Sequence, residues 1–188
     1  MKVIGFTVLL IAAPFAEAHT GEVQSGFMSG LSHPFLGLDH LLAMLAVGIW
    51  AGKMGGKASW RVPLAFIIIM FVSALFSQGL VSMPLIENGI AVSLLLLGLF
   101  IVLAVKLPVA MGMIVVSLFA VSHGVAHGVE LPVAASPFWY VSGFFLTTAL
   151  LHAVGVMAGA SRNDKSLMFI RLAGAFIATT GGFMLLAN

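Results

Sequence analysis

Cysteine is absent from this chain of 188 residues. Disulfide bonds, thiolate metal sites and thiol catalysis are therefore excluded. A metal ion bound by this protein would have to be held by histidine, carboxylate, methionine sulfur or backbone oxygen.

Charged residues are also scarce, at 7% of the chain, against about 25% in an average soluble domain. Hydrophobic residues make up 61%, and the mean hydropathy is +1.18. No polar stretch is long enough to form a separate soluble domain. This composition predicts an integral membrane protein surrounded by lipid. Since the net charge is only +2 and the basic residues flank hydrophobic segments, they indicate membrane topology and not nucleic-acid binding.

Residues 1–18 are typical of a cleaved secretory signal peptide. Lys2 precedes a short apolar core at residues 3–13, and Ala16-Glu17-Ala18 resembles a small-x-small cleavage site. The alternative is a first helix that is not cleaved, although its apolar core is short for a membrane span. Cleavage would make His19 the mature N-terminus. Its amine and imidazole can then chelate a metal together, or it is simply a solvated terminal histidine.

The rest of the chain, residues 19–188, predicts an all-α, polytopic domain with six transmembrane helices. The apolar segments are continuous and do not alternate every second residue, and each can cross roughly 30 Å of hydrocarbon as a helix. The expected spans lie at about 33–51, 62–82, 86–105, 108–129, 137–159 and 167–186.

The charges between these spans predict their orientation. The first, third and fifth connections and their flanks carry the basic residues Lys53, Lys57, Arg61, Lys106, Arg162, Lys165 and Arg171. The second and fourth connections carry Glu87 and Glu130 and neither lysine nor arginine. Positively charged connections stay in the cytoplasm, so both mature termini should face outward.

A polar motif begins the first expected span. His33 and His40 are seven residues apart, which is two turns of a helix, so they should share one face. Met44 continues that face, and Asp39 precedes His40. Ionisable groups within a membrane segment are costly and indicate function. We interpret this motif as half of a metal site.

A second motif ends the fourth expected span. His123, His127 and Glu130 follow at spacings of four and three residues, which places them on one helical face. Two histidines at this spacing can hold one divalent ion, with the carboxylate as a ligand or as a partner of a ligand. The alternative is polar packing between helices. The expected topology puts both motifs near the outer membrane face, where they can meet.

Two further groups are candidates for an ion path. Glu87 opens the third expected span at the outer level, where it can attract cations, act as a ligand or be an ordinary exposed carboxylate. His152 lies 15 residues into the fifth span, about 22 Å below the outer surface. It is either a later station on the path or a buried histidine with satisfied hydrogen bonds. Met44 would add a soft sulfur donor, though methionine in a helix usually serves packing.

The two motifs resemble those of the HupE/UreJ family. That family carries His-x5-Asp-His in its first mature helix, matched by His33, Asp39 and His40. It also carries Phe-His-Gly-x-Ala/Val-His-Gly-x-Glu in its fourth helix. The matching residues are His123, Gly124, Ala126, His127, Gly128 and Glu130, with Ser122 in place of the phenylalanine. The resemblance covers nearly the whole chain.

The resemblance implies a secondary transporter of nickel, or of cobalt in some members, in the bacterial inner membrane. The mature termini would then be periplasmic. The ion would be a transported substrate and not a permanently bound cofactor, and the link to nickel-enzyme maturation would be indirect. A homo-oligomer is left open.

The residues alone leave other functions possible. Imidazoles with carboxylates suit Ni, Co, Zn, Cu or Fe without distinguishing among them. An intramembrane metal-dependent enzyme would need a metal-activated water, but the His-Glu-x-x-His motif is absent. A bis-histidine haem site fits poorly with carboxylates beside the histidines. A metal-binding accessory protein or sensor that does not transport is the remaining alternative. We expect a permease and not an enzyme.

Overall fold

The computed structural model describes residues 22–77, 83–130 and 137–187. The predicted signal peptide and His19 lie outside these residues. Within the described part of the chain every regular element is helical, so the prediction of an all-α protein is confirmed. The elements in chain order are α2 (Glu22–Ser32), the 3-10 turn η2 (His33–Phe35), α3 (Leu38–Met54), α4 (Ala58–Leu75), α5 (Met83–Val102), α6 (Val109–Val129), α7 (Pro137–Ala160) and α8 (Asp164–Ala187).

Five of these helices, α4 to α8, are long and apolar enough to cross a membrane. A sixth crossing exists if residues 26–35 and 38–54 are counted together, although these two segments meet at an angle of 78°. The prediction of a multi-pass membrane protein therefore agrees with the structure, which has five candidate spans, or six if the bent pair is counted as one.

The prediction of a continuous first span over residues 33–51 was wrong. Pro34 lies in the first turn of η2, a position that suits its fixed φ and missing N–H. Gly37 then leaves the helical conformation, with φ −107° and ψ 114°, and α3 starts afresh at Leu38. His33 and His40 therefore belong to different elements and do not share a helical face. Helix α2, which precedes this bend, was not predicted because its apolar residues are interrupted by polar ones.

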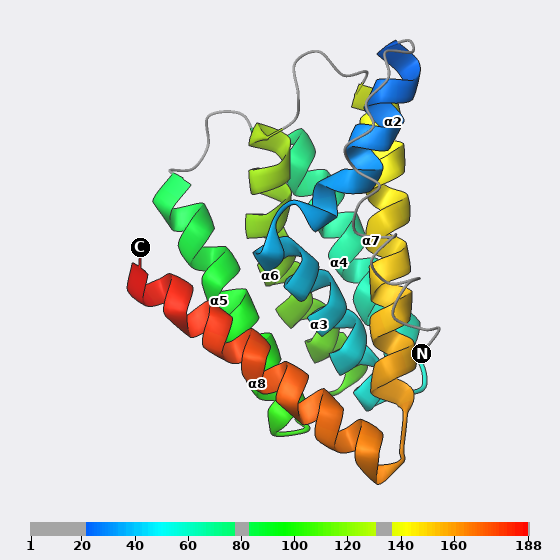
Figure 1. The fold of residues 1–188 in the computed structure, drawn as a ribbon, viewed down its shortest axis with the longest axis vertical. Helices are drawn as coiled ribbons and strands as arrows, with labels where there is room; N and C mark the ends of the chain where they lie inside the picture. Colours follow the sequence, from blue (N-terminus) through cyan, green and yellow to red (C-terminus); the bar gives the residue numbers. More distant parts are fainter. Residues whose placement is uncertain (1–21, 78–82, 131–136, 188) are drawn as a thin grey trace, which may run out of the picture.

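Helix α3 lies at the centre, with α5 and α8 on one side and α7 on the other (Figure 1). The closest helix pairs are α3 with α7, α4 with α6, α5 with α8, and α2 with α7. Glycines allow this proximity: a side chain at Gly48 would collide with the backbone carbonyl of His152, and one at Gly155 with that of Leu45. The close contacts expected from the four-residue glycine spacing are present.

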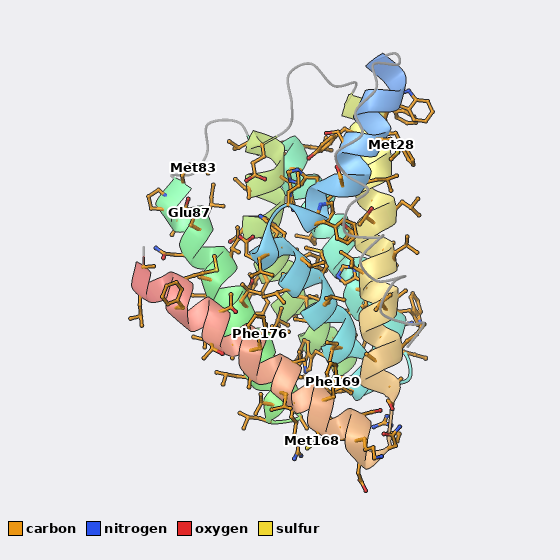
Figure 2. The ribbon with its side chains drawn as sticks, in the orientation of Figure 1. Met28, Met83, Glu87, Met168, Phe169 and Phe176 are labelled. Atoms are coloured by element: carbon orange, nitrogen blue, oxygen red, sulfur yellow. The ribbon has the colours of Figure 1, made fainter. Side chains whose placement is uncertain are left out.

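Large apolar side chains point away from the bundle. Met168, Phe169 and Phe176 on α8 are 64%, 74% and 56% exposed (Figure 2). An apolar surface of this kind on a soluble protein would favour association. A lipid bilayer covers such an apolar surface at no cost in free energy, so we expect α8 to face lipid.

The connections α3–α4, α5–α6 and α7–α8 lie at one end of the bundle, the lower end in Figure 1. These connections and the adjoining helix ends carry the basic residues, from Lys53 to Arg171, that predict a cytoplasmic side. The bend at His33–Gly37 and the end of α6 lie toward the opposite end (Figure 1). This arrangement has the alternating helix directions that the expected topology requires.

Candidate metal centre

Three potential metal ligands converge where the bend before α3 meets the end of α6. The Nε2 atom of His33 lies 3.1 Å from Nδ1 of His127 and 3.2 Å from Oε2 of Glu130. Nδ1 of His127 lies 3.7 Å from the same carboxylate oxygen. Zn–N and Zn–O bonds of roughly 2.1 Å put neighbouring ligand atoms roughly 3–3.5 Å apart. The three side chains are therefore spaced as ligands of a single ion would be, with one donor atom from each within 4.8 Å of the others.

Local structure explains this convergence. His127 and Glu130 are one turn apart at the end of α6, so both side chains project on one side. His33 comes from η2, which the bend turns toward them. The hydroxyl of Thr147 on α7 donates a hydrogen bond of 2.9 Å to the Leu31 carbonyl near the end of α2. This bond satisfies a carbonyl that the helix itself cannot pair, and it fixes the segment that carries His33.

A second pair of histidines lies next to this group and, taken together, is more deeply buried. The Nδ1 atoms of His40 and His123 face each other at 3.3 Å, and both side chains are buried. The ring of His40 is also 4.3 Å from that of His127, measured between centroids. Oδ2 of Asp39 lies 3.7 Å from Nε2 of His40. The four histidines thus form one continuous cluster, which we call the outer cluster: His33, His40, His123 and His127, with Asp39 and Glu130.

Ser93 of α5 orients His123, a role that was not predicted from the sequence. Its hydroxyl donates to the carbonyl of Ile90 at 2.7 Å, so its oxygen accepts a hydrogen bond from Nε2–H of His123 at 3.0 Å. The lone pair of His123 Nδ1 is then directed at His40. A hydrogen bond to the remote ring nitrogen is how proteins hold a metal-binding imidazole in position. A single serine in an apolar helix gives little signal in a sequence, because it equally well bonds only to its own backbone.

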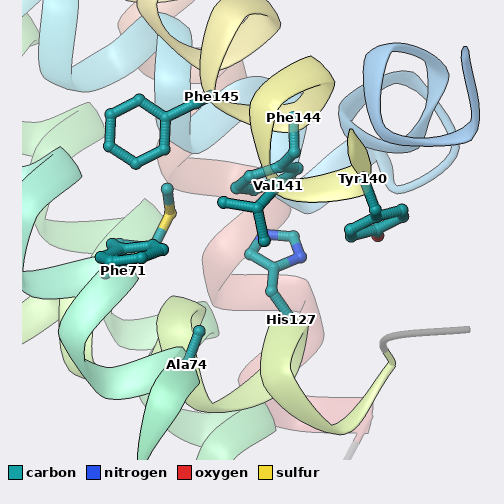
Figure 3. A pocket seen from close by; sticks show the side chains of 8 residues that line it. Phe71, Ala74, His127, Tyr140, Val141, Phe144 and Phe145 are labelled. Atoms are coloured by element: carbon teal, nitrogen blue, oxygen red, sulfur yellow. The ribbon is translucent and has the colours of Figure 1, made fainter. Parts of the chain in front are cut away.

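Aromatic rings from α7 close one side of the outer cluster. Phe144 lies 4.4 Å from His127 and 5.9 Å from His33, and Tyr140 lies 5.7 Å from His33, between ring centroids. Beside them is a small cavity, shown in Figure 3, with His127 on one side and Tyr140, Val141 and Phe145 on another. Its volume of about 30 Å³ exceeds the roughly 10–15 Å³ that one water needs. Nε2 of His127 has no hydrogen-bond partner among the described residues, and apart from His127 and Tyr140 the side chains that line the cavity are apolar.

Glu130 connects the outer cluster to solvent. Its side chain is 42% exposed, against 19% for His33 and 5% for His127. The hydrogen bond with His33 lowers the pKa of the Glu130 carboxyl below its ordinary value, despite partial burial. The carboxylate therefore stays ionised and presents a negative charge at the mouth of the cluster.

The other predicted residues lie elsewhere. Glu87 is exposed at the start of α5 and takes no part in the three-ligand group (Figure 2). Met44 is buried in the hydrophobic core, as packing requires. His152 is buried on α7, deeper in the bundle. None of these three residues belongs to the group formed by His33, His127 and Glu130.

Comparison with known proteins agrees with the motifs. The family model described as HupE / UreJ protein matches residues 7–185. Protein HupE of Rhizobium leguminosarum bv. viciae is 40% identical over 181 residues, which cover 95% of this chain and 95% of that protein. No solved structure matches.

Proposed function

Because the chain belongs to the HupE / UreJ family, we propose that it is a secondary transporter of divalent transition-metal ions. Nickel is the expected substrate, and cobalt is the next candidate. The preference for nickel comes from the family resemblance, since imidazole and carboxylate ligands also accept Co, Zn, Cu and Fe.

The observation that carries this proposal is the meeting of His33, His127 and Glu130 within 4.8 Å. They come from two elements 94 residues apart in the chain, so local sequence alone does not explain their contact. Two imidazoles and one carboxylate match the ligand chemistry of a transition-metal site. Structural zinc sites use four protein ligands, whereas this group offers three and leaves positions for water or for an incoming ligand.

The order of exposure supports transport over static binding. Exposure falls from Glu130 to His33 and then to His127, and His123 behind them is fully buried. A cation arriving at Glu130 can therefore pass from the mouth to the inner pair His40 and His123 by exchanging imidazole ligands. Neutral imidazoles bind an ion without the strong charge attraction that would trap it, and a transporter needs such release.

We place the protein in the bacterial inner membrane, with Glu130 and the bend before α3 on the periplasmic side. The distribution of basic residues supports this orientation. The chain carries no nucleotide-binding motif, so ion gradients would drive transport.

Uptake into proteoliposomes tests the proposal. Vesicles containing the protein should accumulate radiolabelled Ni²⁺ faster than empty vesicles, and Co²⁺ should compete better than Zn²⁺. Equilibrium binding of Ni²⁺ without uptake would instead support the alternative, a metal-binding accessory protein. The absence of both Ni²⁺ binding and Ni²⁺ uptake would contradict the proposal.

Ser93 provides a further prediction. Ser93→Ala should weaken Ni²⁺ binding by about tenfold, because the His123 imidazole loses the hydrogen bond that orients it. Isothermal titration of the purified protein measures this change. Ser142→Ala is the matched control, since that hydroxyl donates only to the Phe138 carbonyl of its own helix and its loss should leave binding unchanged. Equal affinities in both variants would show that Ser93 does not position the cluster.

A further inference from the structure

Helix α7 carries two buried polar side chains that the outer cluster does not use. His152 is 2% exposed and Thr148 is fully buried. Both ring nitrogens of His152 and the hydroxyl oxygen of Thr148 lack a hydrogen-bond partner among the described residues. Leaving such groups unpaired costs about 1–3 kcal/mol each, so their burial together requires a reason.

These two side chains lie on the same face of α7, because they are four residues apart. They are also deeper than the outer cluster. Phe144, which contacts His33 and His127, precedes His152 by eight residues, which corresponds to about 12 Å along the helix axis. His152 and Thr148 are therefore a separate feature.

Contacts with α3 and α4 show that this face points into the bundle. A side chain at Gly48 of α3 would collide with the His152 carbonyl. The Phe66 ring of α4 lies 5.5 Å from the His152 ring. The same Phe66 ring lies 5.6 Å from His123, the deepest histidine of the outer cluster. Phe66 therefore contacts both His152 and the outer cluster.

We propose that His152 and Thr148 form a second, inner binding station for the divalent ion, which receives it from His40 and His123. This inference rests on the proposed transport function. An imidazole nitrogen and a hydroxyl oxygen supply two neutral donors, and the ion keeps water in its remaining positions. No carboxylate among the described residues pairs with His152. Binding at the inner station is therefore weaker than at the outer cluster, as release toward the other side of the membrane requires.

Two measurements on proteoliposomes and purified protein test the inner station: the initial rate of Ni²⁺ uptake and the equilibrium Kd for Ni²⁺. His152→Leu should lower uptake by about tenfold or more, while the Kd of the outer cluster changes by less than about twofold. Thr148→Val, which preserves the side-chain shape, should lower uptake in the same direction by a smaller factor. Thr179→Val is the control, because Thr179 is exposed on α8 and its hydroxyl donates to the Ala175 carbonyl. Its uptake should match wild type.

The outcomes separate this inference from the transport proposal. Wild-type protein that takes up no nickel would contradict the transport function. It would also contradict the inner station, unless titration shows a second, weaker Ni²⁺ site that His152→Leu removes. Wild-type uptake rates in folded His152→Leu and Thr148→Val would overturn the inner station alone. If His152→Leu does not fold, Thr148→Val alone tests the inner station. An initial rate of Ni²⁺ uptake equal to that of Thr179→Val would then overturn it.

Discussion

Replacing His127 by alanine should abolish nickel uptake and weaken Ni²⁺ binding by at least about 100-fold. His127 lies between the two halves of the outer cluster, 3.1 Å from His33 and with its ring 4.3 Å from that of His40. Loss of a residue that only supports a ligand costs about 10–100-fold in metal affinity, and loss of a direct ligand should cost at least the upper figure. Radiolabelled uptake and isothermal titration measure the two effects.

Asp164→Asn is the control for this substitution, because it alters an exposed side chain in the first turn of α8. A second check is the double variant His33→Ala and His127→Ala. If both residues bind one ion, the double variant should be no more impaired than His127→Ala alone, since the site is already lost. Wild-type uptake by a folded His127→Ala protein would exclude this histidine from the ion path.

Gly124→Val should destabilise the protein by about 3 kcal/mol or more and remove nickel binding with it. A side chain at Gly124 on α6 would collide with the carbonyl of Met70 and with the Ser73 side chain, both on α4. Backbone atoms cannot move aside as a flexible side chain can, and overpacking of this kind costs about 1–3 kcal/mol or more. Displacing α6 also displaces His123 and His127, which flank this glycine in the chain. Thermal unfolding in detergent, followed by Ni²⁺ titration, measures both effects.

Gly182→Val is the matched control. The nearest atom to a side chain at this position is 4.0 Å away, on Leu95, so the substitution should leave uptake unchanged. A Gly124→Val protein with the thermal stability and Ni²⁺ affinity of Gly182→Val would contradict the close contact between α4 and α6.

The helices that cross the membrane were predictable because their apolar runs are long and uninterrupted. The meeting of His33 with His127 and Glu130 was also foreseeable in outline. Alternating helix directions, inferred from the basic residues, put the start of the first span and the end of the fourth at one level. The metal-binding role of these residues remains a prediction that the geometry supports.

The bend before α3 was not predicted, because hydropathy alone does not register a change of backbone direction. Pro34 and Gly37 are four and one residues before Leu38, and together they give the clearest signal for a break. The glycine repeats indicated close helix contacts, but not which helices would pair. Ser93 and Thr147 were missed because a hydroxyl in an apolar helix acquires a partner only once the neighbouring helices are placed.

X-ray absorption spectroscopy of the nickel-loaded protein tests the central claim most directly. The site described above predicts bound Ni²⁺ with at least two imidazole ligands at roughly 2.1 Å, by analogy with Zn–N bonds. It also predicts fewer imidazole ligands per bound nickel in the His33→Ala and His127→Ala double variant, which keeps only His40 and His123 of the outer cluster. Nickel coordinated by oxygen alone in the wild-type protein, or an imidazole signal unchanged in the double variant, would contradict it.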